Sequence, residues 1–163
     1  FDLTVAIEVG LLIACVLFMK RVMETTDISV IKNEIDPNNE SDLEVHEEHL
    51  MVPEGVEVYE INGPYFFGIA TKFEEIMSEL GDRPKVRIIR MRKVPFIDST
   101  GIHNLTNLCE MSKKENIHIV LSGVNEKVHK VLEKAGFYDL LGEDNICPNI
   151  NVALEKAKAI VEK

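Results

Sequence analysis

Residues 86–101 read VRIIRMRKVPFIDSTG and give the strongest indication of the fold class. Its first half is rich in β-branched residues and predicts a strand over Val86–Val94. Its second half predicts the start of a helix, because Asp98, Ser99 or Thr100 can cap the first free backbone N–H groups. A strand that runs directly into a capped helix is typical of an α/β sheet with parallel pairs.

Strand and helix patterns alternate on both sides of this stretch. In chain order the other predicted elements are a strand near 43–51, a half-buried strand at 56–59, a helix over 70–80, a helix of about four turns from residue 102, a strand over 117–121, a helix over 124–135 and a last helix over 152–161. We therefore expect an α/β domain of about 110 residues, with a mixed sheet whose parallel pairs are covered by about four helices.

The acidic charge of the chain is concentrated in one segment. The 163 residues carry a net charge of −10, and residues 32–60 hold ten acidic residues against one basic residue. Residues 61–163 are nearly balanced. Because phosphate neutralisation requires a basic face, we expect no nucleic-acid partner. We interpret residues 23–42 as an acidic linker and residues 43–163 as the folded domain.

An apolar run, LTVAIEVGLLIACVLFM, occupies residues 3–19. A signal peptide carries its positive charge before the apolar run, whereas here Lys20 and Arg21 follow it. A core helix keeps a polar stripe, which this run lacks. We therefore expect residues 1–22 to span a membrane, with the two basic residues placing the rest of the chain in the cytoplasm. The chain begins with Phe1 rather than Met, so we expect it to be part of a longer protein.

Glu8 is the single charge within the apolar run. It could line a transport path or lie near the outer membrane interface, and we favour the second interpretation. The three cysteines, Cys15, Cys109 and Cys147, have no paired spacing. They predict reduced thiols, in agreement with a cytoplasmic domain.

The sequence contains none of the common catalytic signatures, such as a glycine-rich phosphate loop or a nucleophile elbow. His46 and His49 are three residues apart in the acidic segment, whereas a zinc-binding helix requires a spacing of four. A calcium-loop pattern over 36–47 lacks its glycine and its flanking helices. We expect no enzyme, no catalytic residue, no cofactor and no metal site.

Basic residues gather in one part of the sequence, around the predicted central strand. They are Arg83, Lys85, Arg87, Arg90, Arg92 and Lys93. Alternate members of a strand point to opposite faces, so they do not form one continuous patch. They could bind an anionic headgroup or the acidic residues 36–48, but we expect them to lie at strand ends and in loops, in solvent.

The candidate functional site is the loop Asp98–Gly101. A phosphate on Ser99 or Thr100 would meet the free N–H groups and the positive end of the helix dipole. It would add nearly two negative charges beside Asp98 and could change which partner docks there. Local physics favours simple helix capping over such a switch.

Residues 56–163, with VRIIRMRKVPFIDSTG at their centre, resemble the STAS domain, which sulfate transporters share with anti-sigma-factor antagonists. The arginine-rich strand and Asp-Ser-Thr-Gly are closer to the transporter branch, the SulP anion permeases (sulfate permeases). Residues 1–10, running into Lys20-Arg21, resemble the last transmembrane helix of those permeases. The two similarities occur in the order that such a permease requires.

The resemblance implies a regulatory and assembly module of a secondary anion transporter at the cell (inner) membrane, with the STAS domain cytoplasmic. Its implied partners are the membrane, through residues 3–19, an upstream transport domain and a second copy in a homodimer. In the antagonist branch the hydroxyl residue before the glycine accepts a regulatory phosphate, which implies Thr100 here with Ser99 adjacent. The alternative is a soluble phosphorylation switch acting through Asp98–Gly101. The sequence does not identify the transported anion, nor whether the domain binds a protein or nucleotide ligand.

Overall fold

The computed structural model describes residues 2–24, 27–31, 34–35, 50–66, 73, 76 and 83–162. Its elements in chain order are α1 (Leu3–Glu24), β1 (Asp27–Ile31), β2 (Glu34–Ile35), β3 (Leu50–Met51), β4 (Val56–Asn62), β5 (Val86–Arg90), α3 (Ser99–Lys114), β6 (His118–Ser122), α4 (Glu126–Lys134), α5 (Phe137–Leu141), a 3-10 turn η2 (Glu143–Asn145), β7 (Ile146–Cys147) and α6 (Ile150–Val161). Most of the strand expected near 43–51 and of the helix expected over 70–80 lies outside these residues, as do His46 and His49 and the pattern over 36–47.

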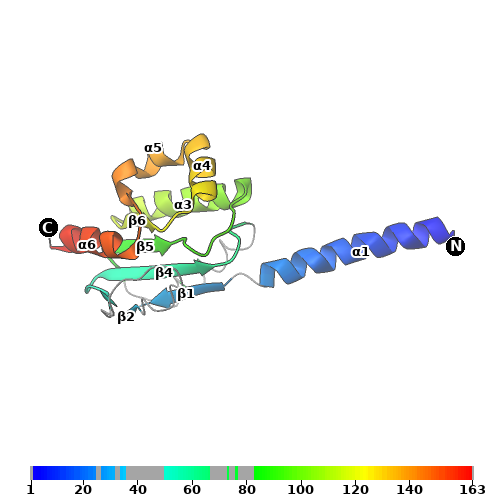
Figure 1. The fold of residues 1–163 in the computed structure, drawn as a ribbon, viewed down its shortest axis with the longest axis horizontal. Helices are drawn as coiled ribbons and strands as arrows, with labels where there is room; N and C mark the ends of the chain where they lie inside the picture. The colour runs from blue at the N-terminus through cyan, green and yellow to red at the C-terminus, as the bar shows by residue number, and fades with distance from the viewer. Residues whose placement is uncertain are drawn as a thin grey trace.

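Helix α1 projects from the rest of the molecule (Figure 1). Its 22 residues correspond to about 33 Å of helix, enough to cross the hydrocarbon core of a bilayer. The segment Leu3–Arg21 has a mean hydropathy of 2.2, and none of it is buried within the structure. By length and composition, α1 could therefore cross a membrane.

The other elements form an α/β domain around a five-stranded sheet in the order β1-β4-β5-β6-β7. Strand β1 is antiparallel to β4, and β4, β5, β6 and β7 are parallel to one another. The carboxyl ends of these four parallel strands meet at one side of the sheet, here called the carboxyl edge, and α1 extends from that side (Figure 1). The prediction of a mixed sheet with parallel pairs is confirmed, and three of the four strand pairings are parallel.

Strand β1 corrects the expected boundary of the linker. It lies inside residues 23–42, which we expected to be linker, yet it pairs along its whole length with β4, from Asp27 opposite Asn62 to Ile31 opposite Val58. Ile28 is buried in the core. Three β-branched residues in five suit a strand, but the acidic composition of the surrounding sequence concealed this local pattern.

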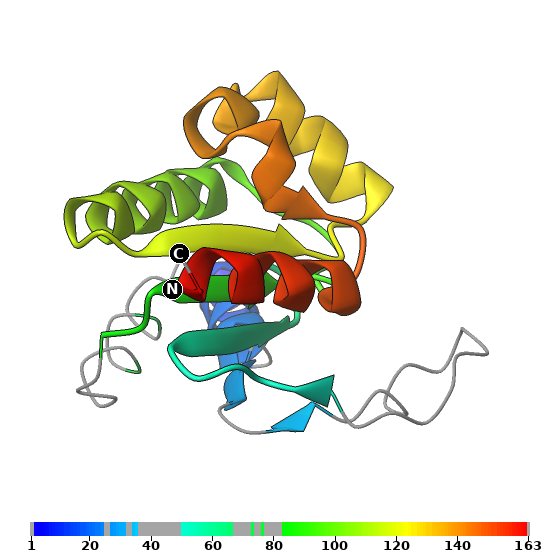
Figure 2. The ribbon, with the colours of Figure 1, turned by 90° about the vertical axis from the view of Figure 1, so that its left-hand side faces the viewer.

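Helices cover both faces of the sheet. Helices α3, α4 and α5 lie on one face and α6 lies on the other (Figure 2). Tyr59 and Ile89 belong to the core under α3–α5, whereas Val58 and Ile88 belong to the core under α6. Every residue of 56–61 is therefore buried, and the expectation of a half-buried strand at 56–59 is wrong, because a central strand of a covered sheet has no solvent face.

Two further boundaries differ from the sequence prediction. Strand β5 ends at Arg90 instead of Val94, because the chain turns, with the Val94 N–H donating to the carbonyl of Met91. The helix expected over 124–135 ends at Lys134, and a separate short helix, α5, follows. Gly136 makes this break possible, since its φ of 69° lies in the left-handed region that glycine favours.

Candidate functional site

The loop Asp98–Gly101 forms the amino end of α3. Asp98 is the N-cap residue, and its Oδ1 accepts a hydrogen bond of 2.7 Å from the Gly101 N–H. Its carbonyl accepts the first helical bond, from the Ile102 N–H at 2.9 Å. Of the three residues that the sequence offered as caps, the structure therefore selects Asp98. Because its carboxylate is committed to the helix, Asp98 has a structural role in this conformation.

Gly101 is required by close packing of the backbone. An added Cβ would lie 2.3 Å from the carbonyl oxygen of Tyr65 and 2.8 Å from a side-chain carbon of Ile97. The same Tyr65 carbonyl accepts a hydrogen bond from the Asp98 N–H at 3.4 Å. The amino end of α3 is thus held tightly against the segment that follows β4.

Ser99 and Thr100 occupy the first two positions of α3, and both are exposed. A kinase or a docking partner could reach their hydroxyl groups. A phosphate on either would lie beside the free N–H groups and the positive end of the α3 dipole. The geometry is compatible with phosphorylation of either hydroxyl. Among the described residues no group of three metal-ligating side chains comes together.

Two buried ion pairs join β4 to β5, and the sequence prediction missed both. On the face covered by α3, Glu57 lies opposite Arg87, with Oε2 3.8 Å from Nε. Arg87 also donates to the hydroxyl of Ser112 in α3, at 3.3 Å. The Tyr59 hydroxyl donates to Glu57 at 2.7 Å, and burial, reinforced by the neighbouring carboxylate, raises the pKa of Tyr59.

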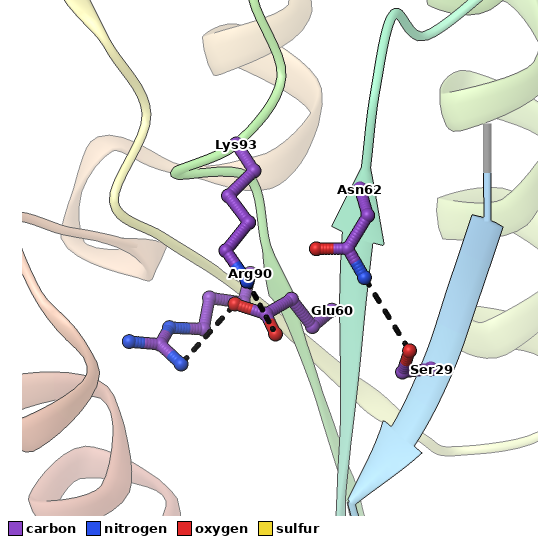
Figure 3. Close-up of polar contacts among 5 residues, drawn as sticks. All are labelled: Ser29, Glu60, Asn62, Arg90 and Lys93. Carbon is purple, nitrogen blue, oxygen red and sulfur yellow. Dashed lines mark hydrogen bonds and ion pairs between the residues drawn. The ribbon is translucent and has the colours of Figure 1, made fainter. Parts of the chain in front are cut away.

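The second pair, Glu60 and Arg90, lies on the face covered by α6 (Figure 3). Glu60 Oε1 is 3.3 Å from Arg90 Nη1, and Glu60 Oε2 is 3.5 Å from Lys93 Nζ. Next to them, Asn62 of β4 donates to the hydroxyl of Ser29 in β1 at 3.3 Å. Burial, with a smaller effect of the nearby Arg92, lowers the pKa of Arg90 to about 10.

Ser29, Glu60 and Arg90 belong to one row that crosses the whole sheet. The register aligns one residue from each strand at the carboxyl edge: Ser29, Glu60, Arg90, Ser122 and Cys147. The Ser122 hydroxyl is buried and has no hydrogen-bond partner within the described part of the chain. Within the row Glu60 is the anion and Arg90 the cation, and Lys93 from the loop after β5 adds a second cation beside Glu60. Together these charges form an internal electrostatic clamp.

Arg87 and Arg90 correct a prediction. We expected the basic cluster to lie in solvent, but these two side chains are only 8% and 5% exposed. Each has its acidic partner at the same register position of β4, which is the condition under which a charged side chain can be buried. The sequence did contain a signal for these pairs: Glu57 and Glu60 have the same spacing along the chain as Arg87 and Arg90.

A pocket of about 320 Å³ lies at the opposite end of α3 from the candidate loop. Its lining residues are Cys109, Lys113, Asn116, Ile117, His118, Ile119, Leu140, Leu141 and Asn145. Burial, with a smaller effect of Glu110, raises the pKa of the Cys109 thiol to about 12. Because the thiolate is the reactive form, Cys109 is a packing residue and not a nucleophile.

Comparison with known proteins supports a single family. The family model of the STAS domain matches residues 49–153. A putative sulfate transporter, YvdB, of Bacillus subtilis is 27% identical over 152 residues, which cover 89% of this chain and 26% of that protein. The chain therefore spans about a quarter of the length of this curated relative.

Two solved structures are similar over the domain. The sulfate transporter family protein from Wolinella succinogenes is 43% identical, with a TM-score of 0.66, covering 70% of this chain and 93% of that one. The STAS domain of a SulP transporter from Vibrio cholerae is 37% identical, with a TM-score of 0.62, covering 69% of this chain and 88% of that one.

Proposed function

The chain belongs to the STAS domain family, and we propose that it is the cytoplasmic regulatory and assembly module of a secondary anion transporter of the sulfate type. In this proposal α1 is the last helix of the transporter's membrane domain. The module is not an enzyme, and it acts on an upstream transport domain and within a homodimer. The similarity to sulfate transporters supports the class of transporter.

One observation carries the proposal: an exposed apolar helix leads directly into the sheet. Only residues 25–26 separate Glu24, the end of α1, from Asp27, the start of β1. A movement of α1 in the membrane would thus be transmitted to β1 and, through its pairing, to β4. Lys20 and Arg21 at the end of α1 favour a cytoplasmic position for the domain at the cell (inner) membrane.

The loop Asp98–Gly101 is the proposed regulatory input. Its two hydroxyl groups are exposed, and the tight contact of Gly101 with Tyr65 links the loop to the residues after β4. A phosphate on Thr100, or on Ser99, would change the charge of this surface without disturbing the cap made by Asp98. The soluble phosphorylation switch is the weaker alternative, because it gives the exposed apolar surface of α1 no role.

A topology experiment tests the membrane part of the proposal. The chain is expressed in a bacterium with green fluorescent protein or alkaline phosphatase fused to its carboxyl end. We expect a carbonate-resistant membrane protein whose fluorescent fusion is bright and whose phosphatase fusion is inactive. A control chain with Leu12→Lys and Ile13→Lys should lose membrane retention. A wild-type chain that stays soluble would favour the phosphorylation switch instead.

A transport experiment tests the regulatory part. Sulfate uptake and oligomeric state are measured for the full-length transporter, with and without the STAS domain, at matched amounts in the membrane. We expect deletion to impair uptake or homodimer assembly. Normal uptake together with normal assembly after deletion would refute the regulatory role.

A further inference from the structure

The carboxyl edge of the sheet faces the membrane if α1 spans it, so the inference below rests on the proposed function. Three residue steps separate Glu24 from Asp27, which limits the distance between their Cα atoms to about 11 Å. Asp27 lies opposite Asn62, the last residue of β4. The register therefore holds the carboxyl end of β4 close to the membrane end of α1, whatever angle α1 makes with the sheet.

The loop after β5 is held at the same edge by backbone hydrogen bonds. The Gly63 N–H donates to the carbonyl of Lys93 at 3.3 Å, and the Tyr65 N–H donates to the carbonyl of Phe96 at 3.0 Å. Figure 1 shows this loop, between β5 and the amino end of α3, on the side of the domain from which α1 extends. The segment Lys93–Phe96 is thus part of the membrane-facing edge.

This segment exposes an aromatic ring and a cation together. Phe96 is 52% exposed, and its ring stacks on the buried ring of Phe66 at a centroid distance of 6.2 Å. Pro95 is exposed beside it. The Lys93 side chain is 39% exposed although its ammonium group also contacts Glu60. A single exposed phenylalanine is common on the surface of a soluble protein. Phe96, however, lies near the end of a membrane helix, where the lipid bilayer can cover its ring.

We propose that Pro95 and Phe96 enter the headgroup layer of the bilayer, with Lys93 directed toward anionic lipid headgroups. Aromatic rings favour the membrane interface, and basic side chains near it are attracted to anionic lipids. The contact gives the domain a second attachment to the membrane besides α1. It orients the carboxyl edge, and with it the loop Asp98–Gly101, toward the lipid surface.

Tryptophan fluorescence tests this contact, because the chain has no tryptophan of its own. The variant Phe96→Trp is placed in nanodiscs of phosphatidylcholine and phosphatidylglycerol, with or without brominated acyl chains as quenchers. The matched control is Met111→Trp, since Met111 is 48% exposed near the other end of α3. Leu12→Trp, in the middle of α1, reports insertion of the helix itself.

We expect quenching of Phe96→Trp to be at least about threefold that of Met111→Trp, with emission shifted to the blue. Replacing phosphatidylglycerol by phosphatidylcholine, or Lys93 by Gln, should reduce this quenching. Pro95→Trp repeats the measurement if Phe96→Trp fails to give the wild-type circular dichroism spectrum.

The controls separate the possible failures. If Leu12→Trp is quenched and both loop variants behave like Met111→Trp, the loop contact is refuted while the membrane span stands. If Leu12→Trp is also unquenched, the membrane placement in the proposed function fails. If the loop tryptophan is unquenched in nanodiscs but shielded from iodide in the full-length transporter, its partner is the transport domain, and the lipid contact is refuted.

Discussion

Glu60 and Arg90 occupy the same register position on neighbouring parallel strands, with Glu60 Oε1 3.3 Å from Arg90 Nη1. Both residues are buried, at 9% and 4% exposure. The pair sits in the row that joins all five strands at the carboxyl edge, next to the hydrogen bond between Asn62 and Ser29. It therefore stabilises the part of the sheet to which β1, and through it α1, is attached.

Glu60→Gln should destabilise the domain by about 3 kcal/mol, because it removes the buried carboxylate charge that lies 3.3 Å from Arg90 Nη1. The measurement is urea unfolding of the whole chain in detergent, followed by near-ultraviolet circular dichroism. The control is Glu126→Gln: Glu126 also forms an ion pair, with Lys130, but its side chain is 80% exposed. That change should cost less than about 0.5 kcal/mol. Equal effects of the two variants would contradict the clamp.

Gly101→Ala should destabilise the domain by about 1–3 kcal/mol or more, because the added methyl group would lie 2.3 Å from the Tyr65 carbonyl oxygen. Thermal unfolding of the chain in detergent measures the effect. Gly10→Ala is the control, since no atom lies within 4 Å of a Cβ at that position. A wild-type melting temperature for Gly101→Ala would show that α3 can move away from the segment after β4.

Asp98→Ala should cost about 1 kcal/mol of stability, because the Gly101 N–H loses its acceptor. Asp98→Asn should retain most of that stability, since an asparagine oxygen caps a helix as well as a carboxylate does. Urea unfolding of both variants distinguishes the cap from a role of the negative charge. If Asp98→Asn were as unstable as Asp98→Ala, the carboxylate charge would be the important property.

Thr100→Asp should leave the domain as stable as the wild type, or more stable by about 0.3–1 kcal/mol. Thr100 is exposed in the first turn of α3, where a negative charge interacts favourably with the helix dipole. A regulatory phosphate there would consequently change partner binding without unfolding the domain. Loss of stability in urea unfolding would argue against phosphorylation at this position.

The chain should lose stability as the pH rises from about 9 to about 12, partly because of Cys109. Its pKa is raised to about 12 in the folded state, from a usual value of 9.0, so above pH 9 only the unfolded state loses the proton. This difference amounts to about 2 kcal/mol at pH 10.5. Cys109→Ala should therefore show a smaller loss between pH 8 and pH 10.5 in urea unfolding. Parallel losses in the two proteins would contradict the raised pKa.

Local patterns predicted most elements well, because caps and periodicity act within a few residues. The start of α3 at Asp98, the strand before it and the last helix all follow from such signals. Helix α1 was predicted from its composition alone, because a helix that is apolar on all sides is rarely exposed in a soluble protein.

Pairings between distant segments could not be predicted in the same way. Strand β1 was assigned to the linker because its role depends on β4, about 30 residues away. The burial of Arg87 and Arg90 depends on two acidic residues of β4 that the parallel register places opposite them. A single sequence shows the charges but not the register that neutralises them.

An α/β domain with a capped helix at Asp98–Gly101, preceded by an apolar helix, could be predicted from the amino-acid sequence. These properties follow from side-chain periodicity, capping chemistry and hydropathy. Which residues share the carboxyl edge depends on tertiary contacts, because strand register brings Asp27 to Asn62 and backbone hydrogen bonds bring Phe96 to Tyr65. The surface proposed to meet the membrane therefore depends on contacts between segments that are far apart in the chain.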